Sequence, residues 1–135
     1  MTPVLLDTSF ILALEDADDQ HHKPAISFWR LFQTRPQPLI VTSYVFDETL
    51  TLVSRSLDHA RAMAVSRRLR SSPSVDLLHI GMEDFTAGLE WFEQYDDKEF
   101  SFTDCVSFAE MRRVKLKTAL TFDQHFTHAG FERKP

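Results

Sequence analysis

Short apolar runs alternate along this chain with segments of helical periodicity, and this alternation limits the folds open to it. The run Val4–Asp7 (VLLD) has no polar residue before its final aspartate, which is typical of a strand covered on both faces. Further β-rich runs occur at Leu39–Thr42 (LIVT), Val75–Ile80 (VDLLHI) and Thr118–Phe122 (TALTF). Strands that alternate with helices in this way predict an α/β fold around a mostly parallel sheet.

Helical periodicity fills the intervals between these strands. We expect helices at residues 8–14, 21–32, 43–57, 58–69, 82–95 and 101–117, and a short edge segment at residues 131–135. Ser43 is the expected N-cap of the third helix. Ser101 and Asp104 have the spacing of a capping box at the start of the sixth.

The composition permits one well-packed domain. With 135 residues, 43% of them hydrophobic, the chain can bury most of the surface that its unfolded form exposes. Phe85, Leu89 and Phe92 form a stripe on one side of their helix. The large aromatic residues, Phe92 among them, are expected to lie in the core, with a dimer or antitoxin surface as the alternative for some of them. No repeat or linker divides the chain, which predicts a single domain over residues 1–135.

Several features predict a cytoplasmic protein that does not associate with a membrane. The longest apolar stretches are far shorter than the ~20 residues that span a bilayer, and the first residues lack the basic region of a signal peptide. The single cysteine, Cys105, excludes an internal disulfide and suits a reducing compartment. We expect it to be a small buried hydrophobic residue.

Charge is distributed unevenly along the sequence. The net charge of −5 does not fit a general nucleic-acid binder. Two basic stretches, Arg61–Arg70 and Arg112–Lys117, nevertheless stand out from the acidic background. Each fits either a solvated helix face or a surface that contacts phosphate groups.

Four acids fall at positions that a parallel sheet brings together. Asp7 ends the first expected strand, and Asp123 follows the expected strand Thr118–Phe122. Asp104 lies in the first turn of the helix expected at 101–117, and Glu48 lies one turn into the helix expected at 43–57. In open α/β sheets, sites form outside the carboxyl ends of the strands. We therefore expect the four carboxylates to converge at one edge of the sheet.

Such a group of carboxylates requires a neutralising partner. The four negative charges repel one another and raise one another's pKa unless a cation balances them. Mg²⁺ prefers oxygen ligands, namely carboxylates, waters and phosphate oxygens. A divalent ion also lowers the pKa of a coordinated water and shields the charge that develops on a phosphodiester. The pattern therefore suggests metal-assisted phosphoryl chemistry.

Each acid also has an ordinary structural interpretation. Asp7 fits a turn or helix cap, Asp104 a capping box and Asp123 an Asx-turn, and Asp47 competes with Glu48 because helix geometry barely separates the two.

The histidines form no convincing metal site. His125 and His128 lie three residues apart with no third ligand near them in sequence. We therefore interpret them as surface or capping residues rather than zinc ligands.

Taken in order, the segments LLDTSF, TSYVFDETLTLV, SFTDC and LTFDQHF resemble the PIN-domain ribonucleases, and most of all the VapC-type toxins of toxin–antitoxin pairs. The resemblance extends from Val4 to about Arg133. It implies one PIN-like nuclease domain, a Rossmann-like α/β/α sandwich with a central parallel sheet. It also implies that the protein is an endoribonuclease that depends on Mg²⁺ or Mn²⁺.

Carried over position by position, the resemblance implies that the catalytic and metal-binding residues are Asp7, Glu48, Asp104 and Asp123. It favours Glu48 over Asp47, because Glu48 follows TSYVFD at the usual place. It makes the Ser9 hydroxyl a support for Asp7 and makes Thr103 an accessory group.

The resemblance further implies an RNA substrate, a homodimer and a cognate antitoxin whose tail covers the acidic site. In this interpretation the basic residues that guide the RNA backbone are Arg67, Arg68, Arg112 and Arg113. One departure from the family is the stretch RRVKLKTA, which lacks the usual glycine and so the easiest left-handed helix end.

Three other functions remain open from the residues alone. A housekeeping PIN-domain RNase differs from a toxin only in its biological role, and a non-catalytic module would use the acids to hold a structural ion. A phosphotransfer protein would use Asp7 as a nucleophile. The last is disfavoured because Ser9 stands where aspartyl phosphatases have a second aspartate.

Overall fold

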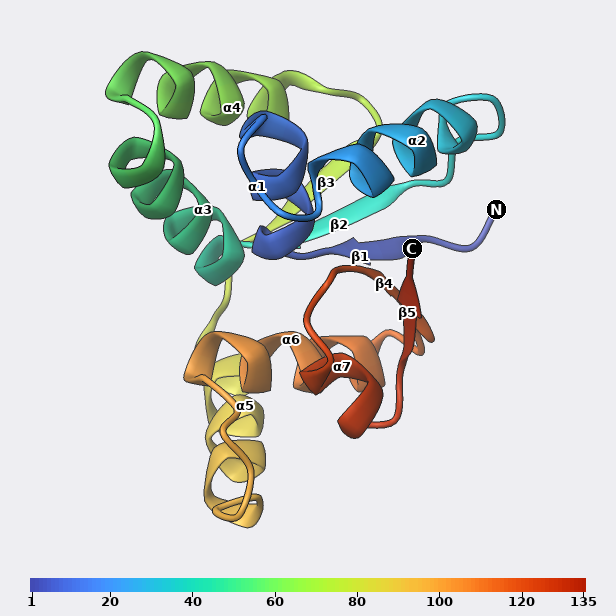
Figure 1. The fold of residues 1–135 in the computed structure, drawn as a ribbon. Coiled ribbons are helices and arrows are strands. Elements are labelled where there is room, and N and C mark those ends of the chain that lie inside the picture. The colour runs from blue at the N-terminus through green and yellow to red at the C-terminus, as the bar shows by residue number, and fades with distance from the viewer.

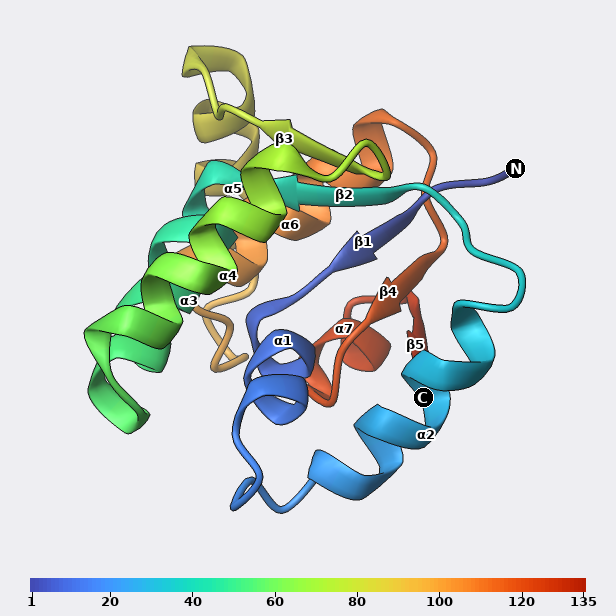
Figure 2. The ribbon, with the colours of Figure 1, turned by 90° about the horizontal axis from the view of Figure 1, so that it is seen from above.

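The computed structural model describes residues 1–135 and has a five-stranded sheet at its centre (Figure 1). The strands are β1 (Val4–Leu6), β2 (Leu39–Thr42), β3 (Val75–Leu78), β4 (Thr118–Leu120) and β5 (Glu132–Lys134). All neighbouring strands are parallel, in the order β3-β2-β1-β4-β5, and Figure 2 shows this order from above. The predicted parallel sheet is confirmed, as is the edge segment at the C-terminus.

Seven helices cover the two faces of the sheet. They are α1 (Thr8–Glu15), α2 (His22–Phe32), α3 (Ser43–Ser56), α4 (His59–Ser71), α5 (Met82–Gln94), α6 (Phe102–Arg113) and α7 (His125–His128). Helices α1 to α4 lie on one face and α5 to α7 on the other, which makes the predicted α/β/α sandwich (Figure 1). No helix has both the length and the apolar character that crossing a bilayer requires.

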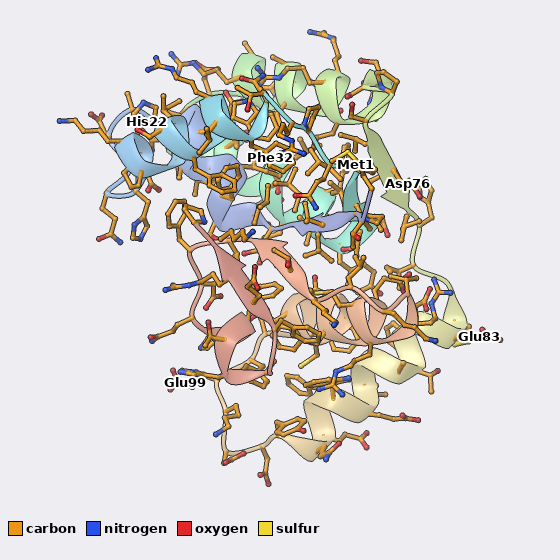
Figure 3. All side chains as sticks on the ribbon, turned by 90° about the vertical axis from the view of Figure 1, so that its right-hand side faces the viewer. Met1, His22, Phe32, Asp76, Glu83 and Glu99 are labelled. Atoms are coloured by element: carbon orange, nitrogen blue, oxygen red, sulfur yellow. The ribbon has the colours of Figure 1, made fainter.

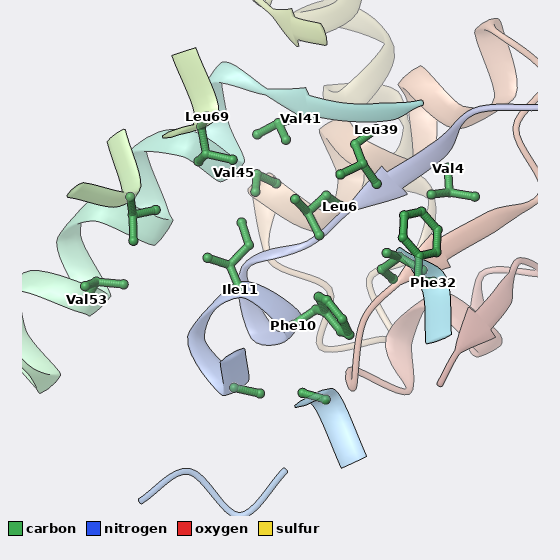
Figure 4. Close-up of a cluster of buried hydrophobic side chains, with 14 of the residues drawn as sticks. Val4, Leu6, Phe10, Ile11, Phe32, Leu39, Val41, Val45, Val53 and Leu69 are labelled. Atoms are coloured by element: carbon green, nitrogen blue, oxygen red, sulfur yellow. The ribbon is translucent and has the colours of Figure 1, made fainter. Parts of the chain in front are cut away.

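Two hydrophobic cores explain why the sequences of β1 and β2 are apolar runs. Val4 and Leu6 face the core beneath α1 to α4, whereas Leu5 faces the core beneath α6 and α7. Leu39 and Val41 belong to the first core (Figure 4), whereas Ile40 belongs to the second. Because successive side chains of a strand point to opposite faces, both must be apolar when both faces are covered.

The first and last turns of the helices depart in detail from the sequence expectations. Thr42, not Ser43, is the N-cap of α3, since its hydroxyl accepts a hydrogen bond from Val45 N at 3.1 Å. The Ser43 hydroxyl instead accepts a hydrogen bond from Ile80 N. The capping box predicted at Ser101 and Asp104 is confirmed.

Helix α6 ends at Arg113 rather than continuing to Lys117. Lys115 adopts a left-handed conformation with φ 59° at the position where a glycine is usual. The N–H of Leu116 donates to the carbonyl of Met111 at 2.8 Å, and the N–H of Lys115 donates to that of Arg112 at 3.3 Å. This pair of bonds is a Schellman motif built without glycine.

Helix α5 extends away from the sheet, and its apolar stripe is not part of a core (Figure 1). Phe85, Leu89 and Phe92 are 39%, 37% and 47% exposed, so the expectation that Phe92 lies in the core is wrong. The rings of Phe85 and Phe92 instead pack against Phe102 at the start of α6. Glu83 and Glu99 both point outward from the molecule, on opposite sides of the view in Figure 3.

Candidate active site

Asp7 is held at the carboxyl end of β1 by two hydroxyl groups. Its backbone N–H donates to the carbonyl of Leu120, so the end of β1 lies against the end of β4. Its Oδ2 accepts hydrogen bonds from Thr121 Oγ1 at 2.7 Å and from Ser9 Oγ at 3.0 Å. The carboxylate does not cap α1, although Asp7 occupies the N-cap position. Its partners therefore set its orientation for something other than helix capping.

Burial and neighbouring acids together make Asp7 difficult to ionise. Burial, together with the charges of Asp104 and Glu48, raises the pKa of Asp7 to about 7, against the opposing effect of the Thr121 and Ser9 hydroxyls. The influence of Asp104 and Glu48 places all three carboxylates in one electrostatic neighbourhood. A cation placed among them would favour their ionised forms.

Asp104 takes part in both a helix cap and the acidic cluster. Its N–H donates to Ser101 Oγ and its Oδ2 accepts from Ser101 N, while the carboxylate is 7% exposed. Burial raises the pKa of Asp104, and the charge of Asp123 adds to this effect. The capping role and a role in the site are therefore compatible.

The structure separates the two acids of α3 that the sequence left as rivals. Glu48 is half-buried and acts on the pKa of Asp7, whereas Asp47 is exposed. Glu48 therefore faces the cluster and Asp47 faces solvent.

Asp123 is likewise used twice. Its Oδ1 accepts a hydrogen bond from His125 N at 2.9 Å, which is the Asx-turn expected from the sequence. The same oxygen lies 3.3 Å from His125 Nδ1, and the N–H of Asp123 donates to Thr121 Oγ1 at 2.9 Å.

His125 lies beside two of the acids, which its position in the sequence did not indicate. Its Nδ1 lies 3.4 Å from Asp104 Oδ2 and 3.3 Å from Asp123 Oδ1. One ligand atom from each of these three residues lies within 4.8 Å of the others. His128 is exposed, and its ring is 6.3 Å from that of His125. The spacing in the sequence suggested that the two histidines act as a pair, but only His125 lies close to the acids.

Thr121 is the residue that the sequence analysis missed. Its side chain is fully buried and connects Asp7 to the backbone of Asp123 through one hydroxyl. Ser9 Oγ, which also accepts from Phe122 N, lies 3.0 Å from it. The only signal in the sequence is a polar residue at the end of an apolar strand, two positions before an acid.

The basic residues of α6 lie away from the acids. Arg112 and Arg113 are at the opposite end of the helix from Asp104, about 12 Å along its axis. Arg112 stacks over two aromatic rings, while Arg113 pairs with Glu110 and Asp84.

On the other face of the sheet, Arg68 of α4 pairs with Glu15, and Arg67 is exposed without an ion pair. Thr103 is half-buried one residue before Asp104. The structure gathers the four predicted acids, Ser9 and Thr103 at one edge of the sheet, but not the four arginines.

The donor set suits a hard divalent cation. Carboxylate oxygens predominate, one imidazole nitrogen is added, and no lysine or arginine pairs with these acids.

Comparison with known proteins identifies the family. The model of the PIN domain matches residues 4–132, which is nearly the whole chain. The chain belongs to the PIN-domain family. A protein of Mycobacterium tuberculosis named as the 23S rRNA-specific endonuclease VapC20 is 34% identical over 128 residues, covering 95% of each chain. This confirms the sequence prediction of a VapC-like, metal-dependent endoribonuclease, an enzyme that cuts phosphodiester bonds.

Solved structures of PIN-domain proteins share the fold. The crystal structure of M. tuberculosis VapC20, described as a toxin that cleaves the sarcin–ricin loop, superposes with a TM-score of 0.85 at 34% identity and covers 95% of each chain. DNA-bound VapBC from Salmonella typhimurium gives a TM-score of 0.67 at 14% identity, covering 99% of this chain and 98% of the other. The second likeness supports the fold alone.

Proposed function

We propose that this chain is the toxin of a toxin–antitoxin pair and cuts RNA at the acidic edge of its sheet. Asp7, Glu48, Asp104 and Asp123 hold the divalent cation, which is Mg²⁺ or Mn²⁺. The observation that supports this most strongly is the buried carboxylate of Asp7, whose pKa is raised to about 7 among acids that no lysine or arginine neutralises.

The chain's own residues orient the ligands in this proposal. When bound, the cation supplies a Lewis acid that activates water and balances the charge developing on phosphate. Ser9 and Thr121 fix Asp7 through two hydrogen bonds, so its free oxygen is directed into the cluster. Asp123 is fixed by its contact with His125 and by the Thr121 hydroxyl. Thr103 is an accessory group beside Asp104.

The proposed substrate is a structured loop of ribosomal RNA. The M. tuberculosis relative is 34% identical over nearly all of this chain and is named as a 23S rRNA-specific endonuclease. Its structure is described as a sarcin–ricin loop cleaving toxin. Arg67, exposed and unpaired, is the best placed of the four predicted arginines to meet a phosphate. Arg68, Arg112 and Arg113 would have to leave partners within the chain.

The proposed partners are a cognate antitoxin and a second copy of the chain. VapBC from Salmonella typhimurium and from Rickettsia felis, which share the fold, are both toxin–antitoxin assemblies bound to DNA. The exposed stripe at Phe85, Leu89 and Phe92 is a surface on which a second copy would pack.

The test is cleavage of an RNA oligonucleotide that carries the sarcin–ricin loop of 23S rRNA, with an oligonucleotide of scrambled sequence as the control. We expect cuts in the loop with Mg²⁺ or Mn²⁺, none in EDTA and none with Asp7→Asn. Undiminished cleavage in EDTA, or by Asp7→Asn, would contradict the metal-dependent site. Equal cleavage of the scrambled RNA would contradict the substrate.

Expression in cells separates a toxin from a housekeeping RNase. We expect growth arrest on expression of the wild type and normal growth with Asp7→Ala. Normal growth with an active wild-type enzyme would contradict the toxin role and leave the nuclease chemistry intact.

A further inference from the structure

We propose that His125 is a ligand of the divalent cation and that its imidazole makes the site favour Mn²⁺ over Mg²⁺. The inference rests on the proposed metal-dependent function of the same cluster, and adds to it a nitrogen ligand and an order of preference between metal ions. His125 comes from α7, so the site would draw on an element that contributes none of the four acids.

The distances around His125 are those of neighbouring ligand positions. Nδ1 lies 3.3 Å from Asp123 Oδ1 and 3.4 Å from Asp104 Oδ2, and all three ligand atoms fall within 4.8 Å of one another. Adjacent corners of an octahedron lie about 3 Å apart when the metal bonds are about 2.1 Å long. The three atoms therefore need to move little to share one ion.

The imidazole is also held in this position without a metal. The backbone N–H of His125 donates to Asp123 Oδ1, which ties the start of α7 to one of the acids. The ring packs edge-on against Phe100, with centroids 5.4 Å apart, and Phe100 is buried. A side chain that is 28% exposed thus has few other orientations, and little rotamer entropy is lost when it binds.

The chemistry of the donor set gives the preference. Mg²⁺ favours an all-oxygen octahedron and gives up its waters reluctantly, whereas imidazole binds more readily to the divalent ions of the transition series. Mn²⁺ accepts both carboxylate and imidazole ligands. Adding the His125 imidazole to the carboxylates therefore raises the affinity for Mn²⁺ by more than it raises the affinity for Mg²⁺.

An ion pair is the competing explanation for the same distances, and it predicts the opposite result. A protonated His125 between Asp104 and Asp123 would occupy the place of the cation and compete with it. Removing the imidazole would then tighten metal binding, whereas removing a ligand weakens it. The sign of the change in affinity distinguishes the two.

The experiment measures metal binding without RNA. Mn²⁺ and Mg²⁺ are titrated calorimetrically into wild type, His125→Ala and the matched control His128→Ala, whose side chain is exposed and does not contact the acids. Pulsed EPR of bound Mn²⁺ then detects a directly coordinated ¹⁴N nucleus. We expect a ¹⁴N coupling in wild type and in His128→Ala, its loss in His125→Ala, and a fall in Mn²⁺ affinity of about tenfold or more that exceeds the fall for Mg²⁺.

Two results would overturn the inference while the proposed nuclease stands: bound Mn²⁺ without ¹⁴N coupling in wild type, or Mn²⁺ affinity that is equal or higher in His125→Ala. Asp7→Asn, measured alongside, separates this failure from a broader one. If wild type binds neither ion, or if Asp7→Asn binds both as tightly as wild type, the proposed metal site itself is wrong.

Discussion

The two ends of α6 both bury carboxylates, but they are neutralised differently. At the C-terminal end, Glu110 is 1% exposed and pairs with the guanidinium of Arg113, which also lies 3.1 Å from Asp84. At the N-terminal end, Asp104 faces other acids, and the basic group in contact with it is the imidazole of His125. The chain completes the first cluster by itself and leaves the second short of positive charge.

A raised pKa alone does not distinguish these two clusters. Burial raises the pKa of Glu110 despite the attraction of Arg113, just as burial raises the pKa of Asp7 and of Asp104. The difference lies in the partner: an arginine at one end and no lysine or arginine at the other. The cluster without an internal counter-ion is the one that requires an external cation.

The largest expected effect comes from Asp7→Asn. Loss of this carboxylate should strongly weaken metal binding and reduce RNA cleavage by roughly 10³-fold or more, because several kcal/mol of charge stabilisation is lost. The same change should stabilise the metal-free protein at neutral pH. A pKa raised to about 7 corresponds to a cost of about 4 kcal/mol at most for the ionised group in the folded state.

The size of this stabilisation depends on pH. Folded Asp7 keeps its proton up to about pH 7, whereas the unfolded chain releases it near its ordinary value. The folded state thus binds more protons between these values, and stability from this group falls as the pH rises through them. We expect the free energy of unfolding, measured with urea in EDTA, to fall more between pH 5 and pH 8 for wild type than for Asp7→Asn. Asp47→Asn, on the exposed side of α3, is the control and should behave as wild type.

The next effect concerns the hydroxyl that orients Asp7. Thr121→Val removes a donor to Asp7 and an acceptor from Asp123 N while keeping the shape of the side chain. We expect metal affinity to fall about tenfold, as for other groups that orient ligands, and stability to fall by about 1 kcal/mol. Thr49→Val is the control, since Thr49 is also buried but bonds Thr8. Equal losses of metal affinity in the two variants would contradict a positioning role.

A smaller effect, a loss of stability, is expected at the C-terminal end of α6, where Arg113 neutralises Glu110. Arg113→Met leaves Glu110 beside Asp84 without a cation and should destabilise the fold by about 1–2 kcal/mol, a value limited by the exposure of the guanidinium. The pKa of Glu110 should rise further, so the loss should grow as the pH rises through the acid range. Adding Glu110→Gln should recover part of the stability. Calorimetric titration of Mn²⁺ should give wild-type affinity, and a clear decrease would argue against two independent clusters.

The smallest expected effect is a gain in stability, unlike the losses expected for Thr121→Val and Arg113→Met. Lys115→Gly places the residue best suited to a positive φ at the end of α6 and should stabilise the protein by about 1 kcal/mol. Lys117→Gly, where no positive φ occurs, should be neutral or destabilising. Thermal unfolding of both variants tests this, and metal affinity should not change in either.

The sequence allowed the sheet and helices α1 to α6 to be predicted, because each depends on local pattern, but it did not predict the short helix α7. The four acids came from strand ends and family motifs, and their role as metal ligands stays a prediction. The apolar runs at Val4–Leu6 and Leu39–Thr42 identify buried strands, and the capping box at Ser101 identifies the start of α6. Choosing Glu48 over Asp47 needed the resemblance, since helix geometry alone left both open.

What the sequence did not reveal depends on contacts between distant segments. Thr121 reaches Asp7 across 114 positions, and His125 reaches Asp104 across 21, because β4 lies beside β1 and α7 lies near the start of α6. Periodicity likewise identifies the apolar face of α5 but not whether anything covers it, which is why Phe92 was assigned to the core.

We expect the acidic cluster around Asp104 to bind a cation and the cluster around Glu110 not to. Calorimetric titration of Mn²⁺ into Asp7→Asn, Glu48→Gln, Asp104→Asn and Asp123→Asn, with Asp84→Asn as the control, tests it most directly. We expect each of the four variants to bind Mn²⁺ more weakly than wild type and Asp84→Asn to bind it equally well. Wild-type affinity in all four, or a comparable loss in Asp84→Asn, would contradict the account.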